Sequence, residues 1–303
     1  MDKAAVAGDL QKLVKAKVLT DVPMSSYTTW KIGGPADIMV FPGTEDELAA
    51  VLHCLSENQI PWFVIGNGSN LLVGDRGVRG VVIKLSDRFS AASWRELEVQ
   101  AGAGMLLGTL ALEAAERGAA GLEFARGIPG SVGGAIRMNA GAYGHNLSDF
   151  VTEVTLIDRL GKKQTIPRDE LEFAYRDSSL FRMDAVVVRV GLKLLPGERD
   201  GIMMQMKEYQ RKRGLSQPLE FPSCGSVFRN PANDHAGRLV ELSGLRGLQI
   251  GGAAVSTKHG NFIVNMGGAT AADVRELIEQ VQEQVYDYAG IKLEPEVKFV
   301  GEF

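Results

Sequence analysis

The sequence predicts an α+β fold divided between two domains. Helix patterns and strand patterns alternate along the first half of the chain, and strand patterns return beyond residue 150. A chain of 303 residues also exceeds what one hydrophobic core usually fills. After Pro196-Gly197-Glu198 the strand patterns give way to a charged helix. We therefore expect a helical lead at residues 1–24, a larger domain at 25–197 and a smaller one at 198–303.

The composition narrows the kinds of partner that the protein can have. A net charge of -4 and a pI near 5.7 argue against nucleic acid, because phosphate binding needs clustered Lys and Arg. No apolar run reaches the about 18 residues of a membrane span, and Met1–Lys17 lacks the apolar core of a signal peptide. Cys54 and Cys224 lie far apart and predict neither a disulfide framework nor a metal site. We expect a cytoplasmic protein with no membrane partner and no obligate protein partner.

Helix and strand signals in the first half follow one another closely. Thr44 and Glu47 form the pattern of a capping box for a helix that ends near Asn58. The apolar segment Trp62–Ile65 predicts a strand that runs directly into a glycine-rich loop. Two more strands and a helix are predicted at residues 78–85, 97–101 and 105–117, respectively.

The second half begins with strand patterns and ends with a strongly capped helix. Thr270 and Asp273 cap a helix with one apolar face, Val274 to Tyr288, that stops at Gly290. A last strand is expected at Ile291–Val300. The remaining predictions are strands at 151–158, 164–166 and 185–195 and a helix at 198–213.

The loop Gly66-Asn67-Gly68-Ser69-Asn70 has small residues that would let several backbone N–H groups point at an anion such as a pyrophosphate. It is equally compatible with a tight turn. Leu71 rules out the G-x-G-x-x-G pattern, and the Lys of a Walker loop is missing. The segment Gly102–Gly108 comes closer to that pattern, but its third glycine is one residue late. We interpret it as a closely packed strand-to-helix turn.

The segment Gly127–Gly144 is rich in glycine and has almost no periodicity. Such a segment is long for a plain connection. It would let a flat or charged ligand approach the backbone, or it could form a flexible lid.

Further polar residues cluster in three places. Residues 222–231 place hydroxyl, amide and guanidinium groups between two prolines, while Cys224 has no base near it in sequence and is expected to be buried filler. Arg176 could be a surface charge or an anion clamp. Glu294 and Glu296 would share one face of the last strand, as a solvated edge or as part of a site.

Seven segments, taken in order, resemble the UDP-N-acetylenolpyruvoylglucosamine reductase family along nearly the whole chain. Any one of them could arise by chance, but their order makes chance an inadequate explanation. The segments are Thr28–Gly34, Gly66–Leu71, Gly127–Gly144, Tyr175–Ser178, Gly225–Pro231, Gln249–Ala253 and Leu293–Val297.

The resemblance implies an FAD-binding domain of the vanillyl-alcohol-oxidase (PCMH-type) architecture with two subdomains, followed by a smaller α+β substrate domain. The flavin would be noncovalent, since Gly66–Leu71 contains no His or Cys. Its pyrophosphate would lie on the first glycine loop and the rest against the second. The implied cofactor residues are Ile65, Gly66, Asn67, Gly68, Ser69, Asn70, Leu71, Gly127, Ile128, Pro129, Gly130, Ser131, Gly134, Ala135, Asn139, Ala140, Gly141 and Val187.

The same resemblance implies reduction of UDP-N-acetylglucosamine enolpyruvate to UDP-N-acetylmuramate in peptidoglycan synthesis, with NADPH as the hydride donor. Ser226 would donate the proton, with Arg176 and Glu296 at the substrate carboxylate. Glu296 would assist an enolate mainly when protonated, so we expect a raised pKa for it. The implied substrate contacts are Tyr175, Arg229 (where Lys is common in the family), Asn230 and Gln249.

The family has a subtype with a Tyr-bearing lid insertion, which the stretch Gly191–Gln217 is too short to hold. The chain therefore resembles the shorter, lid-poor subtype. Three other functions are considered: a sugar or alcohol oxidoreductase of the same architecture, a catalytically silent sugar-nucleotide-binding protein, and a serine hydrolase. The last lacks a His near Ser226 in sequence to activate the hydroxyl.

Overall fold

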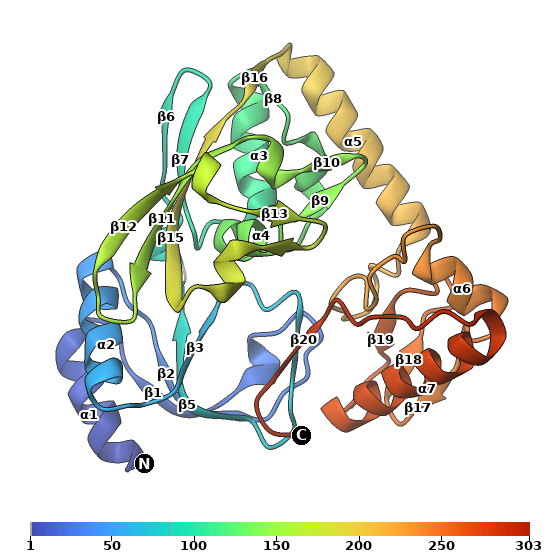
Figure 1. Ribbon diagram of the computed structural model, residues 1–303, viewed down its shortest axis with the longest axis horizontal. Coiled ribbons are helices and arrows are strands. Elements are labelled where there is room, and N and C mark those ends of the chain that lie inside the picture. Colours follow the sequence, from blue (N-terminus) through green and yellow to red (C-terminus); the bar gives the residue numbers. More distant parts are fainter. Residues whose placement is uncertain (1, 86) are drawn as a thin grey trace. The chain divides into compact units, whose positions relative to one another are not determined.

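The computed structural model describes residues 2–85 and 87–303 (Figure 1). They separate into two compact units, each assembled from segments distant in sequence. The first unit comprises the chain up to Thr20, Asp37–Asn67 and Gly80–Arg211; the second comprises Asp21–Ala36, Gly68–Arg79 and Lys212–Phe303. These units are defined by contacts and break the chain at other points than the domains expected at 25–197 and 198–303. Those domain bounds therefore stay a prediction.

A five-stranded antiparallel sheet, in the order β12-β11-β15-β7-β6, forms the centre of the first unit. Its longest strand, β15 (Ala185–Lys193), carries a run of valines that are buried, as expected of a central strand. The short helix α4 (Val132–Arg137) packs on β15 and β7 (Figure 1). The other strands are β6 (Ala92–Arg95), β7 (Glu98–Gly102), β11 (Val151–Asp158) and β12 (Lys163–Pro167).

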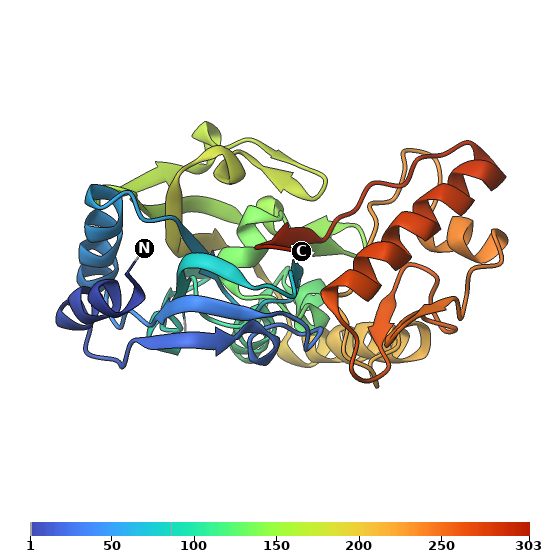
Figure 2. The same ribbon diagram turned by 90° about the horizontal axis from the view of Figure 1, so that it is seen from below.

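A four-stranded sheet has the order β1-β2-β5-β3, with β3 and β5 parallel. Helices α1 (Lys3–Leu13) and α2 (Glu45–Glu57) pack against each other, side by side in Figure 2. The strands are β1 (Leu19–Pro23), β2 (Pro35–Val40), β3 (Trp62–Ile65) and β5 (Val78–Lys84).

Of the two hydrogen bonds of the capping box predicted for α2, the one accepted by Thr44 is confirmed. The Thr44 hydroxyl accepts the Glu47 N–H at 3.1 Å. The Glu47 carboxylate, however, accepts from the N–H of Gly43 at 2.6 Å, one residue before the expected partner. The first contact satisfies an N–H group that a helix start leaves without a partner, and the second holds the residue just before the cap.

Two helices and several two-residue strands complete the first unit, and the last residues of α5 belong to the second. The predicted helix at 105–117 is α3 (Leu107–Glu116), and the charged helix predicted at 198–213 is α5 (Arg199–Ser216). The close packing proposed for Gly102 is confirmed, since a Cβ there would lie 2.0 Å from the Phe89 carbonyl oxygen. The remaining strands are β8 (Ala119–Ala120), β9 (Gly141–Ala142), β10 (His145–Asn146), β13 (Phe173–Ala174), β14 (Asp177–Ser178) and β16 (Leu195–Pro196).

The second unit has its own core of helix on sheet. Helix α7 (Ala271–Ala289) packs on the sheet β17-β18-β19 (Figure 1), and its predicted capping box and Gly290 stop, with φ +67°, are confirmed. Tyr288 was wrongly placed on the apolar face, because it is 59% exposed. The other elements are β17 (Gln249–Ile250), β18 (Ala253–Val255), β19 (Ile263–Asn265) and α6 (Ala236–Leu242).

The strand predicted at Ile291–Val300 is wrong for most of its length. Only β20 (Lys298–Val300) is a strand, and it pairs in parallel with β4 (Leu71–Val73). Pro295 makes a single bridge to Phe228, and since proline has no N–H it cannot extend a ladder. Glu294 and Glu296 therefore lie on an irregular segment instead of a regular strand.

None of the helices in the described part of the chain is long and apolar enough to cross a membrane.

Candidate active site

The first glycine loop begins where β3 ends at the buried Ile65. The backbone N–H groups of Gly66, Asn67, Gly68 and Ser69 donate to no other described residue. A Cβ on Gly68, which has φ +62°, would lie 2.1 Å from the Tyr27 carbonyl oxygen. A row of available N–H groups on small residues fits the phosphate oxygens of a dinucleotide. This observation favours the ligand-binding interpretation of the loop over a plain turn.

Within the first unit, the start of this loop meets the second glycine-rich segment. The Asn67 side-chain amide donates to the Pro129 carbonyl, and a Cβ on Gly66 would lie 2.1 Å from the Ser131 hydroxyl oxygen. The two predicted cofactor segments are thus brought into direct contact here. Because the segments touch at this point, a cofactor bound to both would lie beside this contact and not between the touching residues.

Lys84, at the end of β5, is a residue of this region that sequence reasoning missed. Its ammonium donates to the carbonyl of Gly66, and burial lowers the pKa of Lys84. A half-buried cation beside the loop adds positive charge where phosphates are expected. In the sequence, Lys84 is only a lysine at the end of an apolar strand, and such a lysine usually extends into solvent.

Ser131 and Asn139 bound the helix α4, which lies inside the second glycine-rich segment. The Ser131 hydroxyl caps α4 by accepting the Gly134 N–H at 3.3 Å. The Asn139 amide is buried and occupied, since it donates to the Ala174 carbonyl at 3.0 Å and accepts the Ser148 N–H at 3.1 Å. The segment is therefore an ordered cradle and not the flexible lid considered above. Asn139 helps to hold the cradle in shape, which leaves its backbone as the part that could meet a cofactor.

Arg176 lies beside this cradle in the first unit. Its guanidinium donates to the Gly141 carbonyl at 2.8 Å and lies 5.0 Å from the centre of the Tyr175 ring. Its backbone has φ +55°, which is uncommon for a residue with a side chain and points to a functional constraint. Since a guanidinium donates to several acceptors at once, it could still bind a carboxylate. These contacts favour an anion clamp over an ordinary surface charge.

In the second unit, Ser226 and Glu296 come from paired segments. The Glu296 N–H donates to the Val227 carbonyl at 2.7 Å, and the Arg229 N–H donates to the Glu294 carbonyl at 2.9 Å. Ser226 is half-buried and follows Gly225, which has φ +82°. The Ser226 hydroxyl makes no hydrogen bond to another described residue. Two predicted catalytic residues are thus neighbours, although Arg176 belongs to the other unit and its role with them stays a prediction.

The later part of the first glycine loop also belongs to the second unit. The Asn70 amide donates to the Glu296 carbonyl at 3.3 Å, and the Lys298 N–H donates to the Asn70 carbonyl at 3.0 Å. Pairing of Leu71 with Lys298 continues this contact into strands β4 and β20. Within the second unit, the end of the loop expected to hold the cofactor is therefore hydrogen-bonded to the segment that carries Glu296.

The predicted substrate residues have different surroundings. Asn230 accepts the Ala236 N–H at 3.1 Å and so caps the start of α6, while the exposed Gln249 amide donates to the Gly251 carbonyl at 2.8 Å. Arg229 is half-buried next to Asn230, and Tyr175 is 50% exposed in the first unit. Their substrate contacts stay predictions.

The segment Thr28–Trp30 supports the Ser226 region, a role that sequence reasoning did not find. The Thr29 hydroxyl donates to the Ser223 carbonyl at 2.7 Å. The fully buried Trp30 donates its indole N–H to the Ile263 carbonyl at 2.9 Å. Only the resemblance marked this segment, because nothing local in it predicts contacts about 200 positions away.

Cys224 is buried, and burial raises the pKa of its thiol, as expected of a small filler and not of a nucleophile. His259 is partly buried, which lowers its pKa, and its Nδ1 accepts the Asn261 N–H at 3.1 Å. Among the described residues, no group of three or more His, Cys, Asp or Glu could hold a metal ion.

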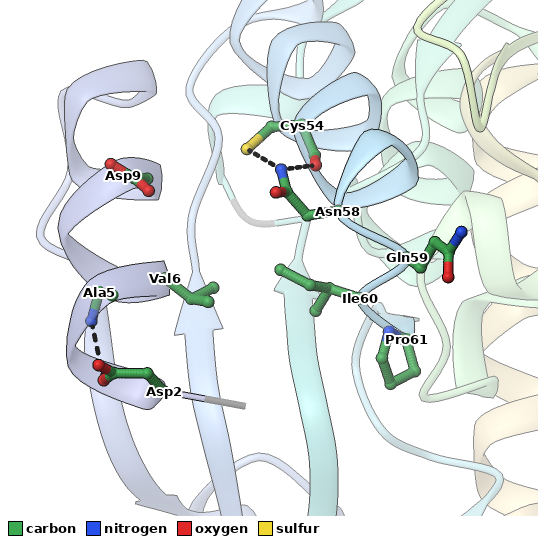
Figure 3. Close-up of a pocket in the computed structure, with 9 residues that line it drawn as sticks. All are labelled: Asp2, Ala5, Val6, Asp9, Cys54, Asn58, Gln59, Ile60 and Pro61. Carbon is green, nitrogen blue, oxygen red and sulfur yellow. Dashed lines mark hydrogen bonds between the residues drawn. The ribbon is translucent and has the colours of Figure 1, made fainter.

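A pocket of about 320 Å³ lies between α1 and the C-terminal end of α2 (Figure 3). It is lined by apolar and acidic side chains and by the Cys54 thiol, and none of the predicted site residues reaches it. The lining residues are Asp2, Ala5, Val6, Asp9, Cys54, Asn58, Gln59, Ile60 and Pro61. It is therefore separate from the candidate active site.

Two family models match the chain. Residues 35–166 match the model described as "FAD binding domain", and residues 217–300 match "UDP-N-acetylenolpyruvoylglucosamine reductase, C-terminal domain". These matches confirm the predicted α+β fold with an FAD-binding domain followed by a C-terminal domain of this reductase family; that the C-terminal domain binds the substrate stays a prediction.

Full-length relatives agree with the family models. The UDP-N-acetylenolpyruvoylglucosamine reductase of Heliobacterium modesticaldum is 50% identical over 92% of this chain and 90% of its own. That of Alkaliphilus oremlandii is 44% identical over all of both chains. The crystal structure of the corresponding reductase from Thermus caldophilus superposes with a TM-score of 0.81 at 39% identity, covering 94% of this chain and 98% of that one. The chain thus belongs to the UDP-N-acetylenolpyruvoylglucosamine reductase family of FAD-dependent oxidoreductases.

Proposed function

We propose that the protein reduces UDP-N-acetylglucosamine enolpyruvate to UDP-N-acetylmuramate, a step of peptidoglycan precursor synthesis, with NADPH as the source of hydride. The reaction adds a hydride to the distal carbon of the enolpyruvyl double bond and a proton to the carbon that bears the carboxylate. When bound, FAD accepts the hydride from NADPH and supplies it to the substrate. A cytoplasmic location belongs to the same proposal, since a sugar nucleotide and NADPH are cytoplasmic metabolites.

One observation carries the proposal: the hydrogen bond from the Glu296 N–H to the Val227 carbonyl holds Ser226 and Glu296 on neighbouring segments. A serine hydroxyl is a weak acid, so it can donate a proton only to a carbanion that develops within hydrogen-bond reach. The Ser226 hydroxyl has no described partner that would compete for that proton. The arrangement suits a proton donor better than a hydrolytic nucleophile, which would need a base.

Arg176 and Glu296 would act on the substrate carboxylate. Hydride addition leaves negative charge on the carboxylate-bearing carbon as an enolate, which a guanidinium stabilises electrostatically. Glu296, when protonated, would donate a hydrogen bond to the same oxygens, as neutral carboxyl groups do at other enolate sites. The noncovalent cofactor would be held by the N–H groups of Gly66–Ser69 and by the cradle at Gly127–Gly141. Tyr175, Arg229, Asn230 and Gln249 would bind the substrate.

The test separates the two half-reactions of the FAD-loaded enzyme without oxygen. We expect Ser226→Ala to be reduced by NADPH as fast as the parent and to be reoxidised by UDP-N-acetylglucosamine enolpyruvate at least about 10²-fold more slowly, the usual scale of general-acid loss. Ser223→Ala is the matched control, because it removes a hydroxyl three positions away. Unchanged reoxidation in Ser226→Ala would refute the assigned role. Rapid peroxide formation under air would instead favour the sugar or alcohol oxidase.

A further inference from the structure

The backbone that follows Ser226 is held largely by one residue, Asn261. The Asn261 oxygen Oδ1 accepts the Phe228 N–H at 2.8 Å, and its Nδ2 donates to the Phe228 carbonyl at 2.8 Å. The backbone carbonyl of Asn261 also accepts the Val227 N–H at 2.9 Å. Together with the bond from Glu296 to Val227, every backbone polar group of Val227 and Phe228 is paired, three of the four with Asn261.

These contacts require the chemistry of an amide. Asn261 is only 4% exposed, so its side chain has no competing water. A single amide can accept from an N–H and donate to a C=O at the same time, whereas an ionised carboxylate can only accept and an aliphatic side chain can do neither. Asn261 is itself fixed, because its own N–H donates to His259 Nδ1 at 3.1 Å.

We propose that Asn261 is a positioning residue for the reaction: its amide clamps Val227 and Phe228 and thereby fixes the place of the Ser226 hydroxyl relative to the segment that carries Glu296. The inference rests on the proposed function, in which Ser226 donates the proton. Gly225, just before Ser226, has φ +82° and nothing within 4 Å of where a Cβ would be, so the chain on that side does not restrain the serine by packing. The residue next to Ser226 on that side is therefore unpacked, whereas both residues that follow Ser226 are held by hydrogen bonds.

A second buried asparagine in the same unit, which makes no hydrogen bond to Val227 or Phe228, provides the matched control. Asn265 is also buried, and its Nδ2 donates to the Trp30 carbonyl at 3.0 Å while its Oδ1 accepts the N–H groups of Gly267 and Ala269 at 2.9 and 3.2 Å. None of these side-chain contacts touches Val227 or Phe228. Asn261→Asp and Asn265→Asp thus make the same chemical change at two buried amides, and only the first acts on the clamp.

The experiment uses the FAD-loaded full chain and measures both half-reactions and thermal stability. In Asn261→Asp we expect reduction by NADPH within about twofold of the parent and reoxidation by the enolpyruvyl substrate about 10- to 100-fold slower, the range associated with sub-ångström to 1 Å misplacement. Asn265→Asp should lose thermal stability but keep both rates.

As pH falls, the carboxyl group introduced by Asn261→Asp becomes protonated and can donate to the Phe228 carbonyl, so the rate of reoxidation relative to the parent at the same pH should recover. Dividing by the parent rate removes the part of the pH dependence that both proteins have in common.

Three outcomes overturn the proposal: reoxidation of folded Asn261→Asp at the parent rate, equal slowing of both half-reactions, or equal slowing in Asn265→Asp. Should Asn261→Asp fail to fold, His259→Phe tests the same clamp, because it removes the acceptor of the Asn261 N–H. Unchanged reoxidation in that variant would equally overturn the proposal. Ser226→Ala, measured in parallel, separates the two claims. If Ser226→Ala is reoxidised normally, the proton-donor assignment fails; if it is slow while Asn261→Asp is not, only the positioning role fails.

Discussion

The side-chain amide of Asn70 donates a hydrogen bond to the backbone carbonyl of Glu296, 3.3 Å away and 226 positions later in the chain. Asn70 closes the glycine loop expected to hold the cofactor, and Glu296 is expected to act on the substrate. The Lys298 N–H returns a bond to the Asn70 carbonyl, so the contact is anchored on both sides. The end of this loop and the segment that carries Glu296 are therefore restrained by each other.

Asn70→Asp should weaken FAD binding about tenfold. The carboxylate cannot donate to the Glu296 carbonyl, and it adds negative charge next to the expected pyrophosphate. Loss of one net hydrogen bond costs about 0.5–1.5 kcal/mol, which corresponds to up to about tenfold in affinity. Titration of apoprotein with FAD, followed by flavin fluorescence, measures the effect. Asn58→Asp, at the end of α2, is the control, and an equal loss of affinity in both variants would contradict the prediction.

Gly66→Ala should abolish most FAD binding, because the new methyl group would lie 2.1 Å from the Ser131 hydroxyl oxygen and 3.1 Å from its Cβ. Such overpacking typically costs about 1–3 kcal/mol. The double variant Gly66→Ala with Ser131→Gly removes the clash and should regain affinity relative to Gly66→Ala. Ser131→Gly alone measures the cost of the lost α4 cap. If the double variant binds no better than Gly66→Ala, the predicted steric conflict is not the cause.

Arg176→Lys should slow reoxidation by substrate and leave reduction by NADPH nearly unchanged. A lysine keeps the charge but lacks the planar fork that can contact Gly141 and a carboxylate together. Loss of a donor that stabilises developing negative charge costs about 10²–10³-fold, and Arg176→Gln should approach that limit. Stopped-flow absorbance of the flavin separates the two steps. Equal reoxidation rates in all three proteins would remove Arg176 from the site.

Glu296→Gln should retain more activity than Glu296→Ala, because a neutral amide can donate to an enolate oxygen as a protonated carboxyl does. The pH-rate profile of the parent enzyme should show a group that titrates above the ordinary range of a glutamate, and Glu296→Gln should lack that limb. A parent profile without such a group would count against a protonated Glu296.

Asp273 should make the second unit sensitive to acid. Hydrogen bonds from the Thr270 and Gly252 N–H groups, at 3.0 and 3.2 Å, hold the pKa of Asp273 below its ordinary 3.8, with the Thr270 contact the larger cause. Because the folded pKa is the lower one, this contribution to stability is full above pH 3.8 and disappears as pH falls through the folded value. Asp273→Asn should therefore lower the free energy of unfolding by about 0.5–1 kcal/mol at neutral pH, after allowance for its exposure.

Denaturant titrations at neutral pH and below pH 4 measure this change. The difference between Asp273→Asn and the parent should shrink as the pH falls. Thr270→Ala is the companion variant, since it removes the reciprocal half of the capping box without removing a titrating group. A difference that stays constant with pH would show that the carboxylate charge is not involved.

Local features of the sequence predicted the elements whose signals lie within a few residues of each other. The cap at Thr44, the box of Thr270 and Asp273 and the glycine stop at Gly290 are confirmed because each satisfies backbone groups of its own helix end. The ordered motifs were also sufficient to assign the family. The prediction of a strand at Ile291–Val300 was wrong. The residue pattern of this segment favoured a strand, whereas Pro295 permits only one bridge.

Tertiary structure alone decided which residues meet. Three contacts illustrate this: the pairing of the Ser226 and Glu296 segments, the hydrogen bond from Asn70 to Glu296, and the clamp by Asn261. Each joins positions far apart in the sequence, and no local sequence pattern predicts which distant residues will meet. Backbone carbonyls and N–H groups make most of these contacts, and they are the same in every residue type except proline. The sequence by itself therefore determined the fold class, the family and the residues available for chemistry; the long-range hydrogen bonds of the folded chain decided how those residues are held.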